Sequence, residues 1–430
     1  MLPLDFVHAF CLAGVAVYIW LREPPRLLLA PLMLLSFLVL YGVGNIIYFL
    51  GEDTVPDPRG AVTSSLIMMW FGLVIGLELA RAVSPSLTAK SDLVVRRWKV
   101  TALSDRADGD QLLAAIGILA ALYMLATFFY LGKQSELLNF ASLQSSVEKA
   151  RYRHDFGNEG GYVYQTLIAS VGPFLSFVLL LKGMASKRRY LLAIGLLVFA
   201  GVFAGKIGTY EKTPWLVYVL QLIVVFQACR SLDFGIGRVL VYSIIMLAGV
   251  VLAVVIALPQ LDAVGILEFL SYRFFQVNNE VVYQTFYVYP HYLPHTWGMN
   301  IGLIHSLFGA GELVSAHTAV ANFFGADGAT FDSFFIGDAW VDFSYGGVLV
   351  MSLVVGFVVK SVDIFIMSLG KTPLCVALLG SCMYGLFQLQ VTSAFTAFLS
   401  GGLVFIPLLA SASAGLVNDL SRGVRAPRTG

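Results

Sequence analysis

The sequence predicts an all-α protein that crosses a membrane many times, and three observations support this prediction. Of the 430 residues, 58% are hydrophobic and 12% are charged, whereas soluble domains are about 45–50% apolar and about 25% charged. The apolar residues are gathered into runs long enough to cross the hydrocarbon core of a bilayer. Lysine and arginine are divided unevenly between the alternate connections of these runs.

Eleven apolar runs have the length and composition of membrane-spanning segments. Because only helices satisfy their own backbone hydrogen bonds in lipid at such lengths, each run is expected to be a helix of a single transmembrane domain over residues 1–430. The first run is expected to stay as an anchor, since no small-residue cleavage site follows it. The runs lie near residues 4–21, 27–50, 61–80, 112–131, 162–181, 190–205, 215–229, 239–258, 343–359, 373–388 and 392–410.

The basic residues predict the orientation of the helices. One set of alternate connections holds 19 of the 27 lysines and arginines, and the other set holds 8. Because lysine and arginine concentrate in cytoplasmic loops, the first set is expected in the cytoplasm. The N-terminus is then outside and the C-terminus is cytoplasmic.

Composition also excludes several classes of protein. The net charge is +1, and no long basic run is present, so nucleic acid is not an expected partner. The four cysteines lie in apolar runs or at their ends without CxxC spacing, which argues against a disulfide framework or a cysteine metal site. We expect no metal and no cofactor.

Two of the predicted external connections are long, which is typical of segments that carry function. Residues 132–161 contain apolar positions at helical spacing, which predicts an amphipathic helix at the membrane interface. Residues 259–341 are rich in aromatic side chains, as expected of a segment at the depth of the lipid headgroups. Both loops are therefore predicted to carry amphipathic helices and to cover the outer face.

Several basic residues lie in the predicted external segments, although lysine and arginine generally concentrate in cytoplasmic loops. Arg151, Arg153 and His154 lie in the stretch EKARYRHDFGNEGGYVYQ, while Lys212 and Arg273 lie in later external segments. One interpretation is that they pair with nearby acids or touch lipid headgroups. The other is that they bind an anionic ligand, because guanidinium groups match phosphate oxygens in pairs and do not deprotonate. A pyrophosphate at the membrane surface fits the second interpretation.

External histidines supply candidates for proton transfer. Neutral imidazole at His295 or His317 would suit activation of a sugar hydroxyl near neutral pH. Metal binding is the competing interpretation, because His291 and His295 have i,i+4 spacing. Prolines at 290 and 294 make a regular helix doubtful there, and no carboxylate-rich pattern accompanies the histidines.

Two aspartates mark the outer end of the ninth apolar run. Asp338 and Asp342 have i,i+4 spacing, and an ionisable residue at the edge of a membrane helix is a candidate for substrate binding. A structural role is equally open. Asp342 would cap the helix, and Asp338 would pair with Arg273.

Two motifs together give a resemblance to a known family. The stretch RYRHDFGNEGGYVYQ before one span, combined with FFIGDAWVDFSYGGVLVMSLVVGFV entering a later span, resembles the Wzy-type polymerases of O-antigen and exopolysaccharide repeat units. The resemblance implies a GT-C-like bundle in the bacterial inner membrane. It also implies transfer of a growing glycan to the next undecaprenyl-pyrophosphate-linked oligosaccharide at the outer face, with a chain-length regulator and a flippase as partners.

The resemblance also implies roles for individual residues. Arg151, Arg153 and Arg273 match the arginines thought to hold the pyrophosphate in such enzymes, and Lys212 is a further candidate. Fixed arginines would neutralise the departing pyrophosphate without a metal ion. His295 or His317 would then accept the proton of the acceptor hydroxyl.

Other functions are compatible with the same layout. An O-antigen ligase would use the same donor with a lipid A core acceptor. A flippase or another secondary transporter belongs to a different class, and it would show charged or broken helices near the midplane and two similar halves. A lipid-linked peptidoglycan polymerase shares the number of helices but not the two motifs.

Overall fold

The computed structural model describes a helical chain. Its described residues form α-helices and short π-helical turns, and the β-type contact among them is an isolated bridge between Arg26 and Asp233. The predicted all-α class is therefore confirmed. The described residues are 3–50, 58–104, 110–134, 160–208, 212–233, 251, 255, 262–309, 314–326 and 333–412.

Eight helices in the described part of the chain are long and apolar enough to cross a membrane. Each overlaps one of the predicted apolar runs, so the chain has the architecture of a polytopic helical membrane protein. These helices are Leu4–Arg22, Leu29–Tyr48, Arg59–Val83, Asp110–Leu131, Gly161–Ser186, Arg189–Gly208, Phe335–Ser368 and Pro373–Val391.

The other three predicted runs differ from this group. Residues Pro214–Arg230 form an apolar helix that is shorter than the eight. The run 239–258 lies almost entirely outside the described residues. The run 392–410 does not form one continuous helix, because α19 (Ala394–Phe398) is followed by turns in which Gly402 has φ 80°. A left-handed glycine is a common helix terminator. The total of about eleven spans stays a prediction.

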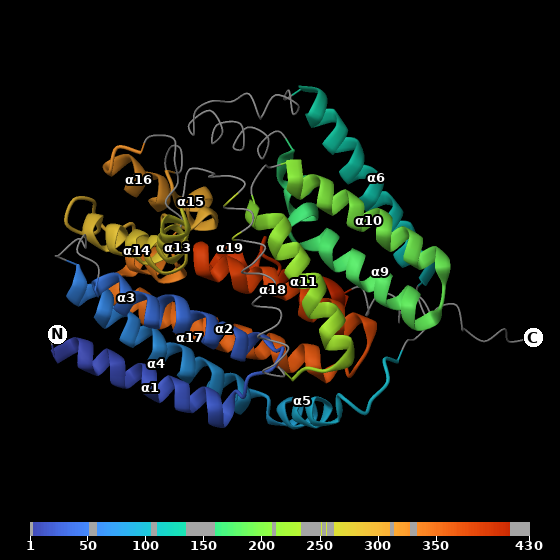
Figure 1. The fold of residues 1–430 in the computed structure, drawn as a ribbon, viewed down its shortest axis with the longest axis horizontal. Helices are drawn as coiled ribbons and strands as arrows, with labels where there is room; N and C mark the ends of the chain where they lie inside the picture. The colour runs from blue at the N-terminus through green and yellow to red at the C-terminus, as the bar shows by residue number, and fades with distance from the viewer. Residues whose placement is uncertain are drawn as a thin grey trace, which may run out of the picture. The chain divides into compact units, whose positions relative to one another are not determined.

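The chain forms two compact units. Unit 1 contains residues Met1–Ala80, Ser231–Phe357 and Gln390–Ser393. Its helices and π-helical turns are α1 (Pro3–Arg22), α2 (Leu29–Phe37), η1 (Leu38–Val43), α3 (Gly44–Leu50), α4 (Arg59–Val83, to Ala80), α13 (Ala263–Ser271), η4 (Tyr272–Gln276), α14 (Val277–Val288), α15 (Gly302–Phe308), α16 (Ala316–Phe323) and the first part of α17 (Phe335–Ser368) (Figure 1).

Unit 2 contains residues Arg81–Arg230, Val358–Leu389 and Ala394–Gly430. Its described elements are α5 (Pro85–Arg97), α6 (Asp110–Gln134), α8 (Gly161–Thr166), η3 (Leu167–Val171), α9 (Gly172–Ser186), α10 (Arg189–Gly208), α11 (Lys212–Arg230), the second part of α17, α18 (Pro373–Val391, to Leu389) and α19.

In unit 2, an ion cluster joins the ends of three helices. Asp110 begins α6, and its two carboxylate oxygens lie 2.5 Å from Lys182 Nζ and 2.5 Å from Arg188 Nη1. Its side chain is only 2% exposed. A buried carboxylate is costly unless it is paired, and the two cations supply that pairing. The cluster therefore ties α6 to the end of α9 and the start of α10.

In unit 1, α4 and α17 approach closely through glycines. A Cβ atom added to Gly76 of α4 would lie 2.2 Å from the carbonyl oxygen of Leu353, and one added to Gly356 of α17 would lie 2.4 Å from that of Leu73. Small residues allow helix backbones to meet at this distance, which favours helix association in lipid. α4 thus forms a close support for the membrane-spanning part of α17.

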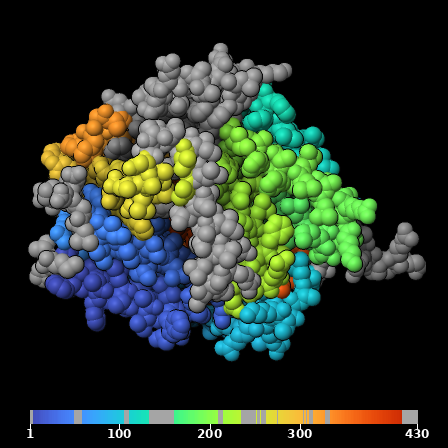
Figure 2. Space-filling model, in the orientation of Figure 1, coloured from blue at the N-terminus to red at the C-terminus, as the bar shows by residue number. Residues whose placement is uncertain are grey.

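A second contact in unit 1 forms at a π-helical turn. The amide of Asn279 donates to the carbonyl oxygen of Leu40 in η1 at 2.9 Å, and the Tyr283 hydroxyl donates to Asn45 Oδ1 at 3.1 Å. Carbonyls in π turns are set out of α-helical register, so a side chain can reach them. Figure 2 shows the yellow helices of residues 262–276 on the near face, beside the blue N-terminal helices of the same unit. Part of the predicted external loop 259–341 is therefore helical and packed.

We expect Gly76→Ala to destabilise the protein by about 1–3 kcal/mol, the usual cost of an overpacked contact. The added methyl group would meet the carbonyl of Leu353, and the two backbones would have to separate. Thermal unfolding of the detergent-solubilised protein measures the effect.

Gly60→Ala is the matched control, because Gly60 lies in the same helix and a Cβ atom there has no neighbour within 4 Å. It should leave the melting temperature unchanged or raise it slightly. Equal melting temperatures for the two variants would contradict the close contact between α4 and α17.

Candidate functional site

The predicted site residues are distributed over both units and the undescribed part of the chain. Arg151, Arg153 and His154 lie outside the described residues, as does nearly all of the predicted amphipathic helix in 132–161. Lys212 begins α11 in unit 2. The remaining candidates belong to unit 1, and they are Arg273, His295, His317, Asp338 and Asp342.

Arg273 is exposed and lies in the π-helical turn η4. Its guanidinium carbon is 5.6 Å from the centre of the Phe269 ring, which is the geometry of a cation–π contact. Within the described residues it has no carboxylate partner, and the alternative pairing with Asp338 does not occur. The guanidinium group is therefore available to an anionic ligand.

α17 is broken directly after Asp342, the second of the two aspartates. Phe343 has φ −138° and ψ 21°, and Ser344 has φ 55° and ψ −146°, values that are not helical. A Cβ atom on Gly347 would lie 2.2 Å from the carbonyl oxygen of Ala339, although eight residues along a continuous helix span about 12 Å. The chain therefore turns sharply between residues 335–342 and the long helix that follows.

The break makes backbone acceptors available to another segment. A continuous helix would direct the carbonyls of Val341 and Asp342 to the residues four positions later. Here they accept hydrogen bonds from the N–H groups of Thr296 and Trp297 at 3.0 and 3.1 Å. The segment that follows α14 is thereby fixed against the end of the first part of α17.

The side chain of Asp342 holds the same segment by further hydrogen bonds. Its Oδ1 accepts hydrogen bonds from the Thr296 hydroxyl at 2.5 Å, from the Gly298 N–H at 3.1 Å and from the Asn300 N–H at 3.4 Å. Asp342 is buried. The carboxylate thus organises a loop, and the predicted cap on its own helix is not the role that these contacts show.

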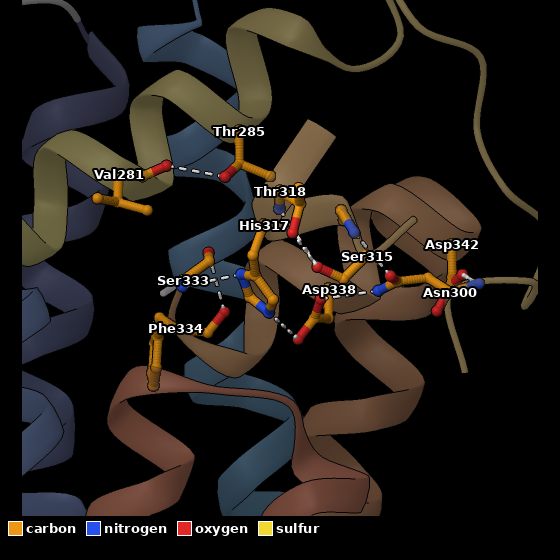
Figure 3. A network of polar contacts seen from close by, with 11 residues as sticks. Val281, Thr285, Asn300, Ser315, His317, Thr318, Ser333, Phe334, Asp338 and Asp342 are labelled. Carbon is orange, nitrogen blue, oxygen red and sulfur yellow. Dashed lines mark hydrogen bonds and ion pairs between the residues drawn. The ribbon is translucent and has the colours of Figure 1, made fainter. Parts of the chain in front are cut away.

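Asn300 connects the two carboxylates, as Figure 3 shows. Its side-chain amide donates to Asp338 Oδ1 at 2.8 Å, while its Oδ1 accepts from the backbone N–H of Ala316 at 2.9 Å. Its own backbone N–H points to Asp342. One residue therefore joins Asp338, Asp342 and the start of α16.

His317 completes this network from α16. Its Nε2 lies 3.4 Å from Asp338 Oδ2, and its Nδ1 accepts a hydrogen bond from the backbone N–H of Ser333 at 3.2 Å. Ser315 caps the same helix, since its hydroxyl accepts from the Thr318 N–H. The cap and the two ring contacts fix the position of the imidazole (Figure 3).

His295 lies at the edge of the network and is half-buried. Its Nδ1 is 3.2 Å from the carbonyl oxygen of Val341. The imidazole meets the ring of Trp340 edge to face at 5.7 Å and that of Trp297 at 6.4 Å. Trp340 is itself anchored, because its indole N–H donates to the Tyr289 carbonyl at 2.8 Å.

The carboxylates of the network affect the pKa of the neighbouring Tyr289. Burial raises the pKa of its phenol, and the carboxylates of Asp342 and Asp338 raise it further. A negative charge on the phenol would be disfavoured both by desolvation and by the neighbouring carboxylates. Tyr289 therefore stays protonated and can donate a hydrogen bond, but it is a poor base.

The residues Thr296, Asn300 and Ser333 belong to this network but carried no signal in the sequence. They are ordinary polar residues in a long aromatic segment, and their partners are far away in the chain. Within the described residues, no group of three or more His, Cys, Asp or Glu side chains has the geometry of a metal site. The network consists of hydrogen-bond donors and carboxylates suited to a polar organic ligand.

Comparison with known proteins adds no family to this description. No protein-family model matches the chain, and neither a curated protein nor a solved structure matches it.

We expect Gly347→Ala to destabilise unit 1 by about 1–3 kcal/mol, because the methyl group would collide with the Ala339 carbonyl across the break. Exchange of the Trp297 and Gly298 amide hydrogens should also become faster. Hydrogen-exchange mass spectrometry and thermal unfolding measure the two effects.

The adjacent Gly346 provides the control, since a Cβ atom there meets nothing within 4 Å. Gly346→Ala should leave both measurements close to those of the unchanged protein. Faster exchange in both variants, or in neither, would be inconsistent with the sharp turn at Phe343 and Ser344.

Proposed function

We propose that the protein is a glycosyltransferase that joins undecaprenyl-pyrophosphate-linked oligosaccharide repeat units at the outer face of the bacterial cytoplasmic membrane. The observation that carries the proposal is the network of Asp338, Asp342, Asn300, His317 and His295 at the start of a membrane-spanning helix. Carboxylates, amides and imidazoles are the groups that bind and activate sugar hydroxyls.

The surroundings of the network also fit a lipid-linked glycan. Large apolar side chains are exposed close to Asn300 in the chain, among them Trp297, Leu307 and Phe308 at 72%, 67% and 74%. Aromatic and aliphatic residues at a membrane interface keep a site close to the lipid surface. A substrate with a polyprenyl tail and a sugar head needs both kinds of surface.

The proposed pyrophosphate contacts are the external basic residues. Arg273 offers an exposed guanidinium group with no acidic partner among the described residues, and Arg151, Arg153, His154 and Lys212 are the further candidates. Cations placed at the leaving pyrophosphate stabilise the charge that develops as the glycosidic bond breaks. This would allow transfer without a metal ion.

A transporter is the second candidate, and the break in α17 is the observation that favours it. Broken helices with polar groups are typical of substrate sites in secondary transporters, where they lie near the bilayer midplane. Here the break follows the eighth residue of a 34-residue helix, so about 36 Å of helix continues beyond it. A position near one end of the span fits a surface reaction better than a midplane transport site.

The test is conversion of the lipid-linked oligosaccharide fraction from cells that lack this protein. Purified wild-type protein should turn that fraction into a ladder of longer glycans on a gel. A ligase would instead require lipid A core as acceptor, and a transporter would move the lipid across vesicles without lengthening its glycan. If no ladder forms, and the protein instead needs lipid A core or only moves the lipid across vesicles, the proposed polymerase function would be rejected.

Arg273→Ala should lower the polymerisation rate by about 10²–10³-fold, the usual loss when one charge-stabilising donor is removed. Arg273→Lys should recover only part of the rate, because an ammonium group cannot bind two phosphate oxygens in the planar manner of guanidinium. Arg96→Ala is the control, since Arg96 is an exposed arginine of α5, in a segment that the sequence predicts to be cytoplasmic. A wild-type rate in Arg273→Ala would remove this residue from the pyrophosphate site.

A further inference from the structure

The two histidines of the network differ in which ring nitrogen keeps a lone pair. A neutral imidazole has one N–H donor and one acceptor nitrogen. His295 Nδ1 lies 3.2 Å from the carbonyl oxygen of Val341, and a carbonyl oxygen can only accept a hydrogen bond. The proton of neutral His295 is therefore on Nδ1, and the lone pair is on Nε2.

His317 has the opposite arrangement. Its Nδ1 accepts the backbone N–H of Ser333 at 3.2 Å, so this nitrogen carries the lone pair. The proton is then on Nε2, which faces Asp338 Oδ2 at 3.4 Å. Both nitrogens of His317 are directed at protein groups, so His317 is a positioning residue that holds Asp338 and the start of α16.

The Nε2 atom of His295, unlike both ring nitrogens of His317, is not directed at a protein group among the described residues. Within the described part of the chain no hydrogen bond to it occurs, and the residue is half-buried. The Trp297 ring beside it is 72% exposed, although its backbone is tied to Asp342 and has φ 52°. A fixed, exposed indole offers a flat apolar surface on which the C–H face of a sugar ring can pack.

We infer that His295 and Trp297 form the acceptor subsite, in which His295 Nε2 takes the proton of the attacking sugar hydroxyl while the ring of that sugar packs on Trp297. The inference rests on the proposed function. The hydroxyl oxygen forms a bond to the anomeric carbon of the donor glycan, and the bond from that carbon to the pyrophosphate oxygen breaks. The pyrophosphate leaves with the electron pair, and the hydroxyl proton moves to Nε2.

The break in α17 is what gives His295 this tautomer. The carbonyl of Val341 is the group that selects Nδ1–H, and it is directed at His295 and Thr296 because the helix does not continue regularly past Phe343. A hydrogen bond from Nδ1–H to a backbone carbonyl is a common way to leave Nε2 ready as a base. The other titratable groups of the network are Tyr289, His317, Asp338 and Asp342.

Two substitutions separate the chemical role from a structural one. His295→Asn keeps an N–H donor at the position of Nδ1, and therefore the bond to Val341, but it removes the base. It should lower the polymerisation rate by about 10²–10⁴-fold, with no change in melting temperature. Trp297→Ala should raise KM for the acceptor more than it lowers kcat.

The control is His291→Asn, since His291 is exposed four residues earlier in the same segment. Its rate should match that of the wild type. A wild-type rate in His295→Asn, with the ladder still formed, would overturn the acceptor subsite and leave the proposed polymerase in place.

A second measurement does not depend on polymerisation. Diethyl pyrocarbonate acylates a ring nitrogen that has a free lone pair, so peptide mass spectrometry should find His295 modified faster than His317. The lipid-linked oligosaccharide fraction should protect His295. Faster modification of His317 would overturn the inference. If His295 reacts first but the wild-type protein forms no ladder, the subsite is overturned together with the proposed function, and only the tautomer assignment stands.

Discussion

Unit 1 depends on a sharp turn of the backbone at Phe343 and Ser344. Ser344 has a positive φ of 55°, a conformation that costs a residue with a side chain roughly 1–3 kcal/mol. The hydrogen bonds formed around the turn offset this cost, because Thr296 and Trp297 bind the freed carbonyls and Asp342 binds the loop that carries them. The strained residue and the network therefore require each other.

The network also supplies hydrogen-bond partners to two buried carboxylates. Asp338 and Asp342 are buried beside the start of an apolar helix, where an unpaired carboxylate is strongly disfavoured. Each carboxylate is held by groups from another segment, and Asn300 contacts both. Since neighbouring hydrogen bonds strengthen one another in such surroundings, the loss of one member affects the whole cluster. This coupling joins α16, α17 and the segment between α14 and α15 into one arrangement.

The sequence predicted the fold class and most of the long helices, because apolar length alone determines which segments can cross lipid. It also marked Asp338, Asp342, His295 and His317 as candidates, since ionisable residues are conspicuous in an apolar chain, and the structure brings these four into one network. The break was not predicted, because the motif has serine where glycine would signal a left-handed turn.

Asn300 and Ser333 were missed because nothing in their local sequence reports a partner that is distant in the chain. The run 392–410 was interpreted as one helix since its apolar composition masked the terminating Gly402.

The π-helical turn η1 makes the length of its segment important to the structure. Such a turn carries one residue more than the α-helical repeat, and each residue of an α-helix advances the side-chain direction by about 100°. Loss of one residue within Leu38–Val43 would therefore rotate α3 and turn Asn45 away from Tyr283. Single substitutions in this apolar stretch preserve the phase of the helix, whereas a one-residue deletion changes it. Length, more than the identity of each side chain, is the property that natural variation would have to keep here.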